Sequence, residues 1–484
     1  MKVLLIVPNF RWANWDKNSL WNFIPHNLCL LASMIREICD VEIIDANLNN
    51  LSYKQLKNEI IDYNPDVVGI TILMDQYGPA GHKTAKLTKE INKSIITVFG
   101  GIYATTNSDY VIKDKSVDFV VIGEGEYVLR DLILYFKGSG NLPKNGIAYK
   151  HNNKVINLGH SDFIMDLDKL PIPAYDLIDL KKYIYTTERK TVDFPPEVPY
   201  MRIFSSRGCP IGCSFCQVRD IMGLRFRMRS PEHVLNEIKY LINNYGIKSI
   251  EFDDDNLITD RQRAIDIFKG LKELNISWVV NALAAFKLDK ELFTIMRDCG
   301  CVYVDIAIES ASERILKDII GKPVKLDKVR EVAAWARELG VFIACNFMIG
   351  FPTETWDEIR KTIRFAEEIN IDYAKIFIVI PLRNTKLFDM CEKGKHFKKG
   401  FKYKDIGWCI GQLESDEYSS DDLTILRAFE WDRINFSSEA KIQKVLDRMK
   451  IPREELEDMR KFTRKNVIQT IIREDERRKS LRKF

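Results

Sequence analysis

Three closely spaced cysteines constrain this chain more than any other feature. Cys209, Cys213 and Cys216 follow the spacing C-x3-C-x2-C, and glycines lie among them. Thiolates this close in sequence turn inward on one soft metal centre, and glycines let a short loop wrap around it. A four-iron cluster normally takes four cysteines, so a loop that supplies three leaves one iron open for a substrate or cofactor. The loop therefore predicts a metal centre with an open position.

A structural zinc site is the alternative interpretation, and it requires four ligands. Between Gln217 and Asp298 the only histidine is His233, and there is no cysteine. A zinc ion would have to recruit Cys299 or Cys301. This alternative stays open at this point.

The chain has 484 residues, which predicts two or three domains. Its net charge of +4 gives no argument for nucleic-acid binding. No apolar run approaches the roughly 18 residues of a membrane span, and the short N-terminal apolar stretch fits a buried strand better than a signal peptide. Ten cysteines are too dilute for a disulfide scaffold, so we expect a reducing, cytoplasmic compartment.

The N-terminal third alternates short apolar strands with helices. This alternation predicts a doubly wound parallel sheet, which binds ligands at the carboxyl ends of its strands. Glycines lie at two of those ends, in Gly100-Gly101 and in Gly123–Glu126. The expected strands are 3–7, 41–44, 67–72, 95–99 and 119–122, and the expected helices are 28–38, 53–63, 80–91 and 127–136.

The central part alternates again, about six times, which predicts a partial (β/α)6 barrel with its site at the carboxyl ends of the strands. The cysteine loop follows the first of these strands. The expected strands are 201–205, 249–252, 278–281, 302–308, 342–347 and 374–380, and the expected helices are 231–245, 261–274, 290–299, 324–339 and 356–369.

The remaining segments divide the chain into four parts. Residues 141–199 lose the alternation and contain several prolines, which predicts a linker between a first domain (1–140) and the barrel (200–397). Residues 398–484 predict a small helical region. Trp431, Phe429 and Phe436 are its expected packing residues, and 451–484 reads as a solvated helix because its charges are mixed in sign.

The cysteine loop resembles that of the radical S-adenosylmethionine (SAM) enzymes, and later strand ends match that family in order. The resemblance implies that the cysteines hold a 4Fe–4S cluster and that the open iron binds SAM. Acidic residues of the run Glu251–Asn256 stand where relatives hold the methionine amine, and Glu309 where they hold the ribose. By resemblance the SAM-binding residues are Phe215, Asp253, Asp254, Glu309, Gly350, Pro352 and Ile378.

The first domain resembles the cobalamin-binding domain that precedes many radical SAM enzymes. The loop Asp75–Pro79 lacks the histidine that binds cobalt in other cobalamin domains, and His82 reads as a surface residue. The residues that the resemblance implies for cobalamin are Thr71, Leu73, Asp75, Gln76, Tyr77, Gly100, Gly101, Gly123, Glu124 and Glu126.

Together these resemblances imply a cobalamin-dependent radical SAM methyltransferase. In that family a 5′-deoxyadenosyl radical removes a hydrogen atom from an unactivated carbon, and methylcobalamin supplies the methyl group. An electron donor such as flavodoxin or ferredoxin is implied, with an organic substrate that the sequence does not identify. A cyclase or rearrangement enzyme with the same cofactors is the first alternative. A methylthiotransferase and a non-catalytic metal-binding protein are the others.

Three arginines alternate after the cysteine loop, at Arg225, Arg227 and Arg229. They either hold an anionic group or face solvent beside the cluster. The sequence alone leaves both interpretations open.

Overall fold

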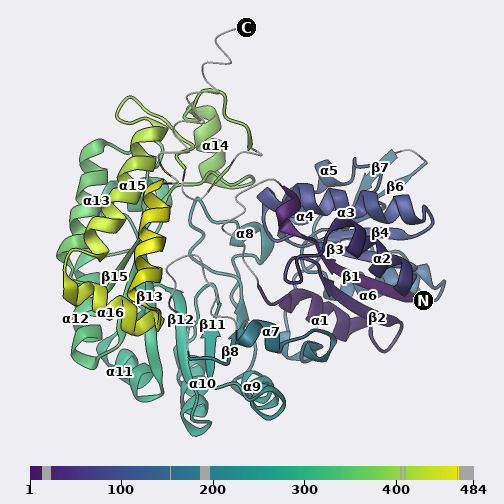
Figure 1. Cartoon of the computed structure of the whole chain (residues 1–484), viewed down its shortest axis with the longest axis horizontal. Helices are drawn as coiled ribbons and strands as arrows, with labels where there is room; N and C mark the ends of the chain where they lie inside the picture. The colour runs from purple at the N-terminus through teal and green to yellow at the C-terminus, as the bar shows by residue number, and fades with distance from the viewer. Residues whose placement is uncertain are drawn as a thin grey trace. The chain divides into compact units, whose positions relative to one another are not determined.

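The computed structural model describes residues 1–13, 23–152, 154–185, 194, 197–403, 406–407, 410–465 and 467. The chain forms two compact units, each built on one sheet (Figure 1). Unit 1 comprises Met1–Thr186 together with Arg219–Gly223 and Arg227–Arg229, and unit 2 comprises the remainder. Two short segments that follow the cysteine loop thus belong to the first unit.

Unit 1 contains a seven-stranded sheet in the order β2-β1-β3-β4-β5-β6-β7. The first five strands are parallel, as predicted, and the last two are antiparallel. β3 is buried throughout because helices cover the central strands on both faces. The strands are β1 (Lys2–Val7), β2 (Asp40–Asp45), β3 (Val67–Thr71), β4 (Ile96–Gly100), β5 (Phe119–Val121), β6 (Ile147–His151) and β7 (Lys154–Asn157).

The helices of unit 1 are α1 (His26–Ile35), α2 (Tyr53–Tyr63), α3 (Gly78–Ile91), α4 (Ile102–Thr106), α5 (Ser108–Val111), α6 (Glu126–Phe136) and α7 (Lys181–Ile184). Four of them (α1, α2, α3 and α6) begin and end close to the predicted positions, whereas the short helices α4, α5 and α7 were not predicted. The strand order reverses between β1 and β3, and open sheets of this kind bind ligands beyond the carboxyl ends of the strands at such a reversal.

Residues 141–185, which the sequence predicts as a linker, carry regular structure. β6 pairs with β5 and β7 pairs with β6, so this segment extends the first sheet. The prolines at 195 and 196, which contributed to the linker prediction, lie outside the described residues. The four-part division of the chain stays a prediction.

Unit 2 contains a six-stranded parallel sheet in the order β15-β14-β13-β12-β11-β8, which confirms the partial barrel. Its strands are β8 (Tyr200–Ile203), β11 (Ser249–Phe252), β12 (Ser277–Leu283), β13 (Cys301–Glu309), β14 (Phe342–Ile349) and β15 (Tyr373–Ile378). Its connecting helices are α9 (Pro231–Tyr245), α10 (Arg261–Glu273), α11 (Lys290–Asp298), α12 (Leu326–Leu339) and α13 (Trp356–Glu368).

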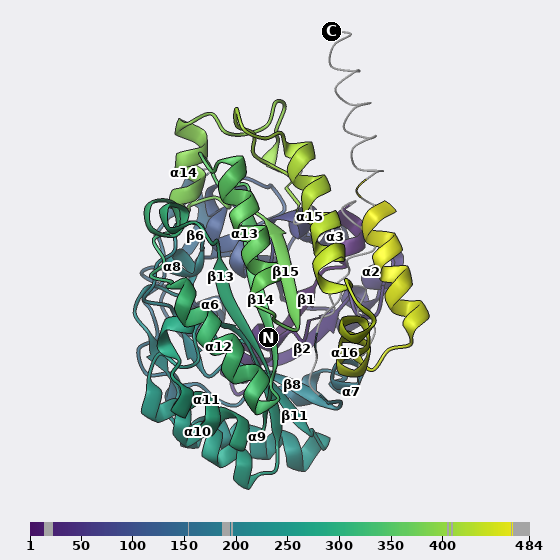
Figure 2. The same cartoon turned by 90° about the vertical axis from the view of Figure 1, so that its left-hand side faces the viewer.

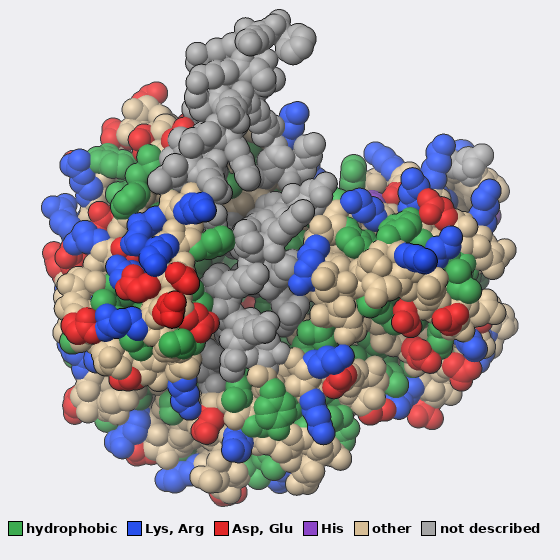
Figure 3. Space-filling model, viewed as in Figure 1, with side chains coloured by type: hydrophobic (Ala, Val, Ile, Leu, Met, Phe, Trp, Pro, Cys, Tyr) green, Lys and Arg blue, Asp and Glu red, His purple; other side chains and the backbone are tan. Residues whose placement is uncertain are grey.

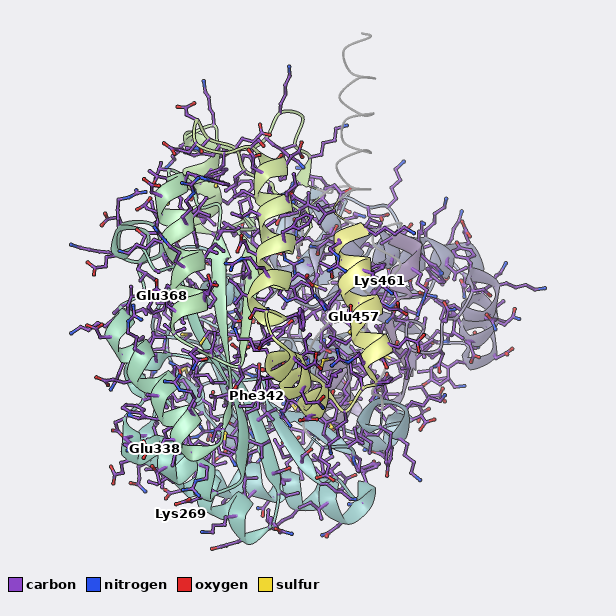
Figure 4. All side chains as sticks on the ribbon, turned by 60° about the vertical axis from the view of Figure 1, so that its left-hand side comes forward. Lys269, Glu338, Phe342, Glu368, Glu457 and Lys461 are labelled. Carbon is purple, nitrogen blue, oxygen red and sulfur yellow. The ribbon has the colours of Figure 1, made fainter. Side chains whose placement is uncertain are left out.

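These helices cover the outer face of the second sheet (Figure 2). Alternate residues of β14 that face the helices, such as Ile343, Phe347 and Ile349, are fully buried. Glu338 and Glu368 lie on the exposed sides of α12 and α13, whereas Phe342 lies at the start of β14 (Figure 4). The hydrophobic periodicity of both kinds of element is therefore realised as predicted.

The C-terminal region packs on the last strand of this sheet. It follows α14 (Lys386–Lys393) and contains α15 (Ser420–Asn435), α16 (Glu439–Met449) and helical residues 453–465, while 468–484 lie outside the described residues. Glu457 and Lys461 lie one turn apart on that last helix (Figure 4). Trp431 and Phe436 are buried as predicted, but Phe429 is 49% exposed, because it lies on the face of α15 turned away from β15.

Helix α15 covers the edge strand β15 through side chains one turn apart. Asn435 accepts from the backbone N–H of Ala374 at 2.7 Å and donates to its carbonyl oxygen at 2.8 Å. Arg427 Nε donates to the carbonyl of Ile376, and Trp431 Nε1 donates to the hydroxyl of Tyr373. The side chains thus satisfy polar groups that an uncovered edge strand would leave unpaired.

Lys, Arg, Asp and Glu side chains intermingle on the surface shown in Figure 3. Within the described ranges, no helix is long and apolar enough to cross a membrane.

We expect Asn435→Leu to lower the free energy of unfolding of unit 2 by about 1–3 kcal/mol, because both polar groups of Ala374 lose their partner while buried. Urea unfolding with a fluorescence readout measures the change. Phe429→Gln on the same helix is the matched control and should stay within about 0.5 kcal/mol, because Phe429 is exposed. Equal stability of Asn435→Leu and wild type would contradict the role of α15 as an edge cover.

Candidate functional site

The cysteine loop begins directly after β9 (Ser206–Arg207), which follows β8. Gly208 and Gly212 have φ angles of +86° and +67°, in the left-handed region that favours glycine. Two backbone hydrogen bonds hold the middle of the loop: Ser214 N–H donates to Ile320, and Leu387 N–H donates to Ser214, each at 2.9 Å. The loop is thus fixed between two segments that are remote in sequence.

The three thiols are partly buried, and burial raises the pKa of Cys213 to about 11 and of Cys216 to about 12. Iron binding would therefore release a proton from each thiol. In the part of the chain that the structure describes, no three His, Cys, Asp or Glu side chains converge tightly enough for one metal ion. A 4Fe–4S cluster makes a different demand, because each cysteine binds a different iron. Three thiols on one short glycine-bent loop fit such a cluster.

Consecutive aspartates after β11 support the start of this loop. Asp254 is 4% exposed and accepts hydrogen bonds from the Ser205 hydroxyl, at 2.8 Å, and from the Ser206 hydroxyl. Burial raises the pKa of Asp254. Asp255, which belongs to the same acidic run, accepts from the backbone N–H of Gly208 at 3.1 Å, a contact that the sequence did not predict. The carboxylate of Asp254 is therefore engaged by protein donors, and its contact with SAM stays a prediction.

Asp253 lies next to an ion pair inside the barrel. Its carboxylate is 3.7 Å from Arg202, which also pairs with Glu251 at 3.1 Å. Asn281 donates to the same Glu251 at 2.8 Å. The aspartates of the acidic run therefore differ in role. Asp253 is half-buried near the interior of the barrel, whereas Asp254 and Asp255 hydrogen-bond to the start of the cysteine loop.

Glu309 ends β13 in a strained backbone conformation, with φ at +77°. Lys322 donates to its carboxylate at 2.8 Å and to the carbonyl of Ala307 at 2.7 Å. The two side chains are only 9% and 5% exposed, so the pair compensates charges that would be costly to bury alone. Sequence reasoning found Glu309 but missed Lys322, because no local pattern links the two.

The turn after β14 lies beside the cysteine loop. The ring centroids of Phe215 and Phe351 are 6.4 Å apart, and Phe351 lies between Gly350 and Pro352 in the sequence. Ile378 at the end of β15 pairs in register with Ile349, next to Gly350. The structure thus brings together the predicted SAM-binding residues of the loop, of β14 and of β15.

Buried side chains hold this turn in place, one from the turn itself and two from the C-terminal region. Glu354 accepts from the backbone N–H groups of Gly350 and Phe351 at 2.7 and 2.9 Å. The Tyr418 hydroxyl donates to the carbonyl of Phe351 at 2.6 Å, and Leu423 occupies the space that a Cβ at Gly350 would need. The sequence offered no motif for these C-terminal contacts.

Unit 1 has a second candidate edge at the ends of β3 and β4. Thr71 is buried and its hydroxyl accepts from Asn27 at 2.8 Å, a partner that sequence reasoning missed. A Cβ added at Gly100 would meet no atom within 4 Å, so this position faces open space. At Gly101 a Cβ would strike the backbone of Ile72, and its φ is +88°. This glycine cradle fits a bulky cofactor such as cobalamin.

The loop after β3 is ordered by its own contacts. Asp75 accepts from Asn107 at 2.8 Å, and Tyr77 stacks on Phe10 with ring centroids 4.0 Å apart. Gln76 is 5% exposed and Leu73 is 40% exposed. These four residues lie at the end of the sheet where the cofactor is predicted, and their contacts with it stay predictions.

His82 is more involved than the predicted surface residue. Its Nδ1 lies 2.6 Å from Asp114, and its Nε2 lies 3.1 Å from the hydroxyl of Tyr103. The ring is partly buried because it packs against Phe99. The expectation of a surface residue is therefore wrong, because the ring is mostly buried. Both ring nitrogens have protein partners.

The turn after β5 is occupied by protein side chains. The His160 ring fills the space that a Cβ at Gly123 would need, and the φ of Gly123 is +93°. Glu124 forms a buried ion pair with Arg227, and Glu126 is 6% exposed at the start of α6. We therefore attribute the glycine at 123 to packing against His160. The predicted contacts of Glu124 and Glu126 with cobalamin remain untested.

Comparison with known proteins decides the family. The radical SAM superfamily matches residues 203–366, and the B12 binding domain matches residues 22–133. An uncharacterized methyltransferase of Pyrococcus horikoshii is 36% identical over 398 residues, which cover 80% of this chain and 83% of that protein. The chain belongs to the radical SAM superfamily and carries a B12-binding domain. Its cofactors are accordingly a 4Fe–4S cluster, SAM and cobalamin.

One further relative and one solved structure are also similar to this chain. The anaerobic magnesium-protoporphyrin IX monomethyl ester cyclase of Rubrivivax gelatinosus is 28% identical over 404 residues, covering 80% of this chain and 69% of that enzyme. The cobalamin-dependent SAM radical enzyme OxsB, with aqua-cobalamin and SAM bound, has the same fold at a TM-score of 0.73 and 19% identity, covering 96% of this chain and 71% of that one.

We expect the free energy of unfolding to depend on pH through Glu354, and a single substitution to remove this dependence. Burial raises its pKa from 4.5 to about 8, despite the amides of Gly350 and Phe351. Because the folded state holds this proton more tightly, the contribution of Glu354 to stability is full below about pH 4.5 and is lost as pH rises through about 8. We expect Glu354→Gln to abolish this loss, measured by urea unfolding from pH 5 to 8.

Glu358 provides the matched control for this measurement. Its pKa is lowered from 4.5 to about 2, against the effect of burial, by hydrogen bonds from Arg314 and Ser312. Its contribution is present above pH 4.5 and is lost only as pH falls through about 2, so Glu358→Gln should lower stability equally at pH 5 and 8. Parallel pH profiles of wild type and Glu354→Gln would refute a buried carboxyl that holds its proton at neutral pH.

Proposed function

We propose that this chain is a cobalamin-dependent radical SAM methyltransferase that methylates an unactivated carbon. The observation that supports this most is the 36% identity to a methyltransferase over 80% of the chain. When bound, the cluster, SAM and cobalamin supply the radical chemistry and the methyl group.

The residues of the chain bind and orient these groups. Cys209, Cys213 and Cys216 hold the cluster, and the turn at Gly350 with the edge of Ile378 packs on the adenine. Glu309, fixed by Lys322, accepts from the ribose hydroxyls. In unit 1, Gly100 leaves room for the nucleotide tail of cobalamin, and the loop at Asp75 faces the corrinoid.

Several finer points belong to this proposal. The reductant is a small redox protein such as flavodoxin or ferredoxin, and the substrate is an organic molecule of unidentified class. The described cysteines are all free thiols, which fits a reducing compartment such as the cytoplasm. Residues 1–140, 200–397 and 398–484 are the proposed limits of the cobalamin-binding domain, the barrel and the helical region.

A cyclase with the same cofactors is the second candidate, because the Rubrivivax cyclase also matches 80% of the chain. A cyclase has no need of methyl transfer from SAM. The two functions therefore differ in the fate of the SAM methyl group.

The test follows that methyl group. We expect the anaerobically reconstituted protein, given reduced cobalamin and methyl-labelled SAM, to transfer label to the cobalamin fraction with an equal amount of S-adenosylhomocysteine. Cys213→Ala is the matched variant: it should lose cluster absorbance and 5′-deoxyadenosine formation but keep cobalamin binding. Release of 5′-deoxyadenosine without any labelled cobalamin would favour the cyclase, and absence of both products would reject the enzyme.

A further inference from the structure

Arg227 belongs to the arginine run whose role the sequence left open. Its side chain is 1% exposed, and that of its partner Glu124 is 3% exposed. One Arg227 nitrogen, Nη1, donates to both carboxylate oxygens of Glu124 at 2.8 Å. A buried arginine of this kind neither faces solvent nor waits for an external anion, because its charge is already compensated within unit 1.

The same guanidinium joins three segments that are distant in sequence. Nη1 also donates to the carbonyl of Ile164, and Nη2 donates to the carbonyl of Met222, each at 2.7 Å. Glu124 in turn accepts from the backbone N–H of Ile164 at 2.6 Å. The ion pair therefore connects the turn after β5, the segment around Ile164 and the stretch that follows the cysteine loop.

Aromatic packing closes this junction. The guanidinium lies 4.8 Å from the centre of the Phe163 ring, a cation–π contact. A Cβ at Gly223 would approach the same ring to 2.9 Å, so the chain passes close to Phe163 only because residue 223 is glycine. His160 covers Gly123 in the same way. The turn at 123–126 follows directly after β5, and the side chains of His160 and Arg227 hold it in place.

We propose that Arg227 is a positioning residue for cobalamin. Through Glu124 it fixes the turn after β5, which lies at the carboxyl edge where the B12-binding domain takes its ligand, and it anchors the segment that follows the cluster cysteines to the same unit. The proposal rests on the proposed function in one respect, namely that unit 1 binds cobalamin. It adds a residue from outside the B12-binding domain, whose match ends at residue 133.

The experiment compares cobalamin affinity with thermal stability in the full chain, reconstituted with its cluster. Hydroxocobalamin is the probe, and equilibrium dialysis under anaerobic conditions gives its dissociation constant. Arg227→Met should weaken binding about tenfold or more, as the loss of a residue that holds a ligating side chain does for bound metal ions. It should also lower the melting temperature, because Glu124 is left buried and charged.

The double variant Glu124→Gln/Arg227→Met separates positioning from stability. It removes both charges, so the melting temperature should return toward that of wild type. Binding should stay weak, because the hydrogen bonds from Arg227 that hold the turn are still missing. Iron content should match wild type in this variant, because neither residue lies in the cysteine loop.

Lys89→Met is the matched control in the same unit. Lys89 pairs with Asp118 at 2.5 Å, but Asp118 precedes β5 and so lies at the amino edge of the sheet, opposite the predicted ligand edge. This variant should lose stability while keeping wild-type affinity for hydroxocobalamin. Wild-type affinity in Arg227→Met, or affinity that follows the melting temperature in all three variants, would overturn the proposal. A wild-type protein that binds no cobalamin would overturn the proposed function as well.

Discussion

The carboxylates at the end of β11 hold the end of β8, and the cysteine loop depends on this interaction. Asp254 accepts from two serine hydroxyls, and Asp255 accepts from the first amide of the loop. Arg263 donates to the carbonyl of Ser205 at 2.6 Å and so restrains the same corner. Because three cysteines must reach three irons at once, an anchored loop start reduces the conformational entropy that cluster binding has to overcome.

Buried ion pairs recur at both candidate ligand edges. Lys322 with Glu309 lies at the edge of the barrel where SAM is predicted to bind, and Arg227 with Glu124 lies at the edge of unit 1 where cobalamin is predicted to bind. Such pairs bring little net stability, because desolvation offsets their attraction, but they fix geometry. Breaking either pair leaves one charge buried and alone. At both predicted ligand edges the chain thus places costly, directional interactions.

The sequence predicted the strands and helices of both sheets well because apolar periodicity reports burial, and burial is what these elements share. It also placed Glu309, Gly350 and the cysteines at strand ends. It missed Lys322, Asp255 and Arg227 as partners, because a pattern shows that a charge is buried but not which distant group compensates it. β6 and β7 were missed as well, because short edge strands with exposed residues have little periodicity.

A single chain holds a 4Fe–4S cluster with an open iron for SAM, together with cobalamin. Electron paramagnetic resonance of the anaerobically reconstituted and reduced protein, recorded with and without SAM, tests this most directly. We predict about four irons and one cobalamin per chain, and a cluster spectrum that changes when SAM is added. A spectrum that SAM leaves unchanged, or a centre with fewer irons, would contradict the account.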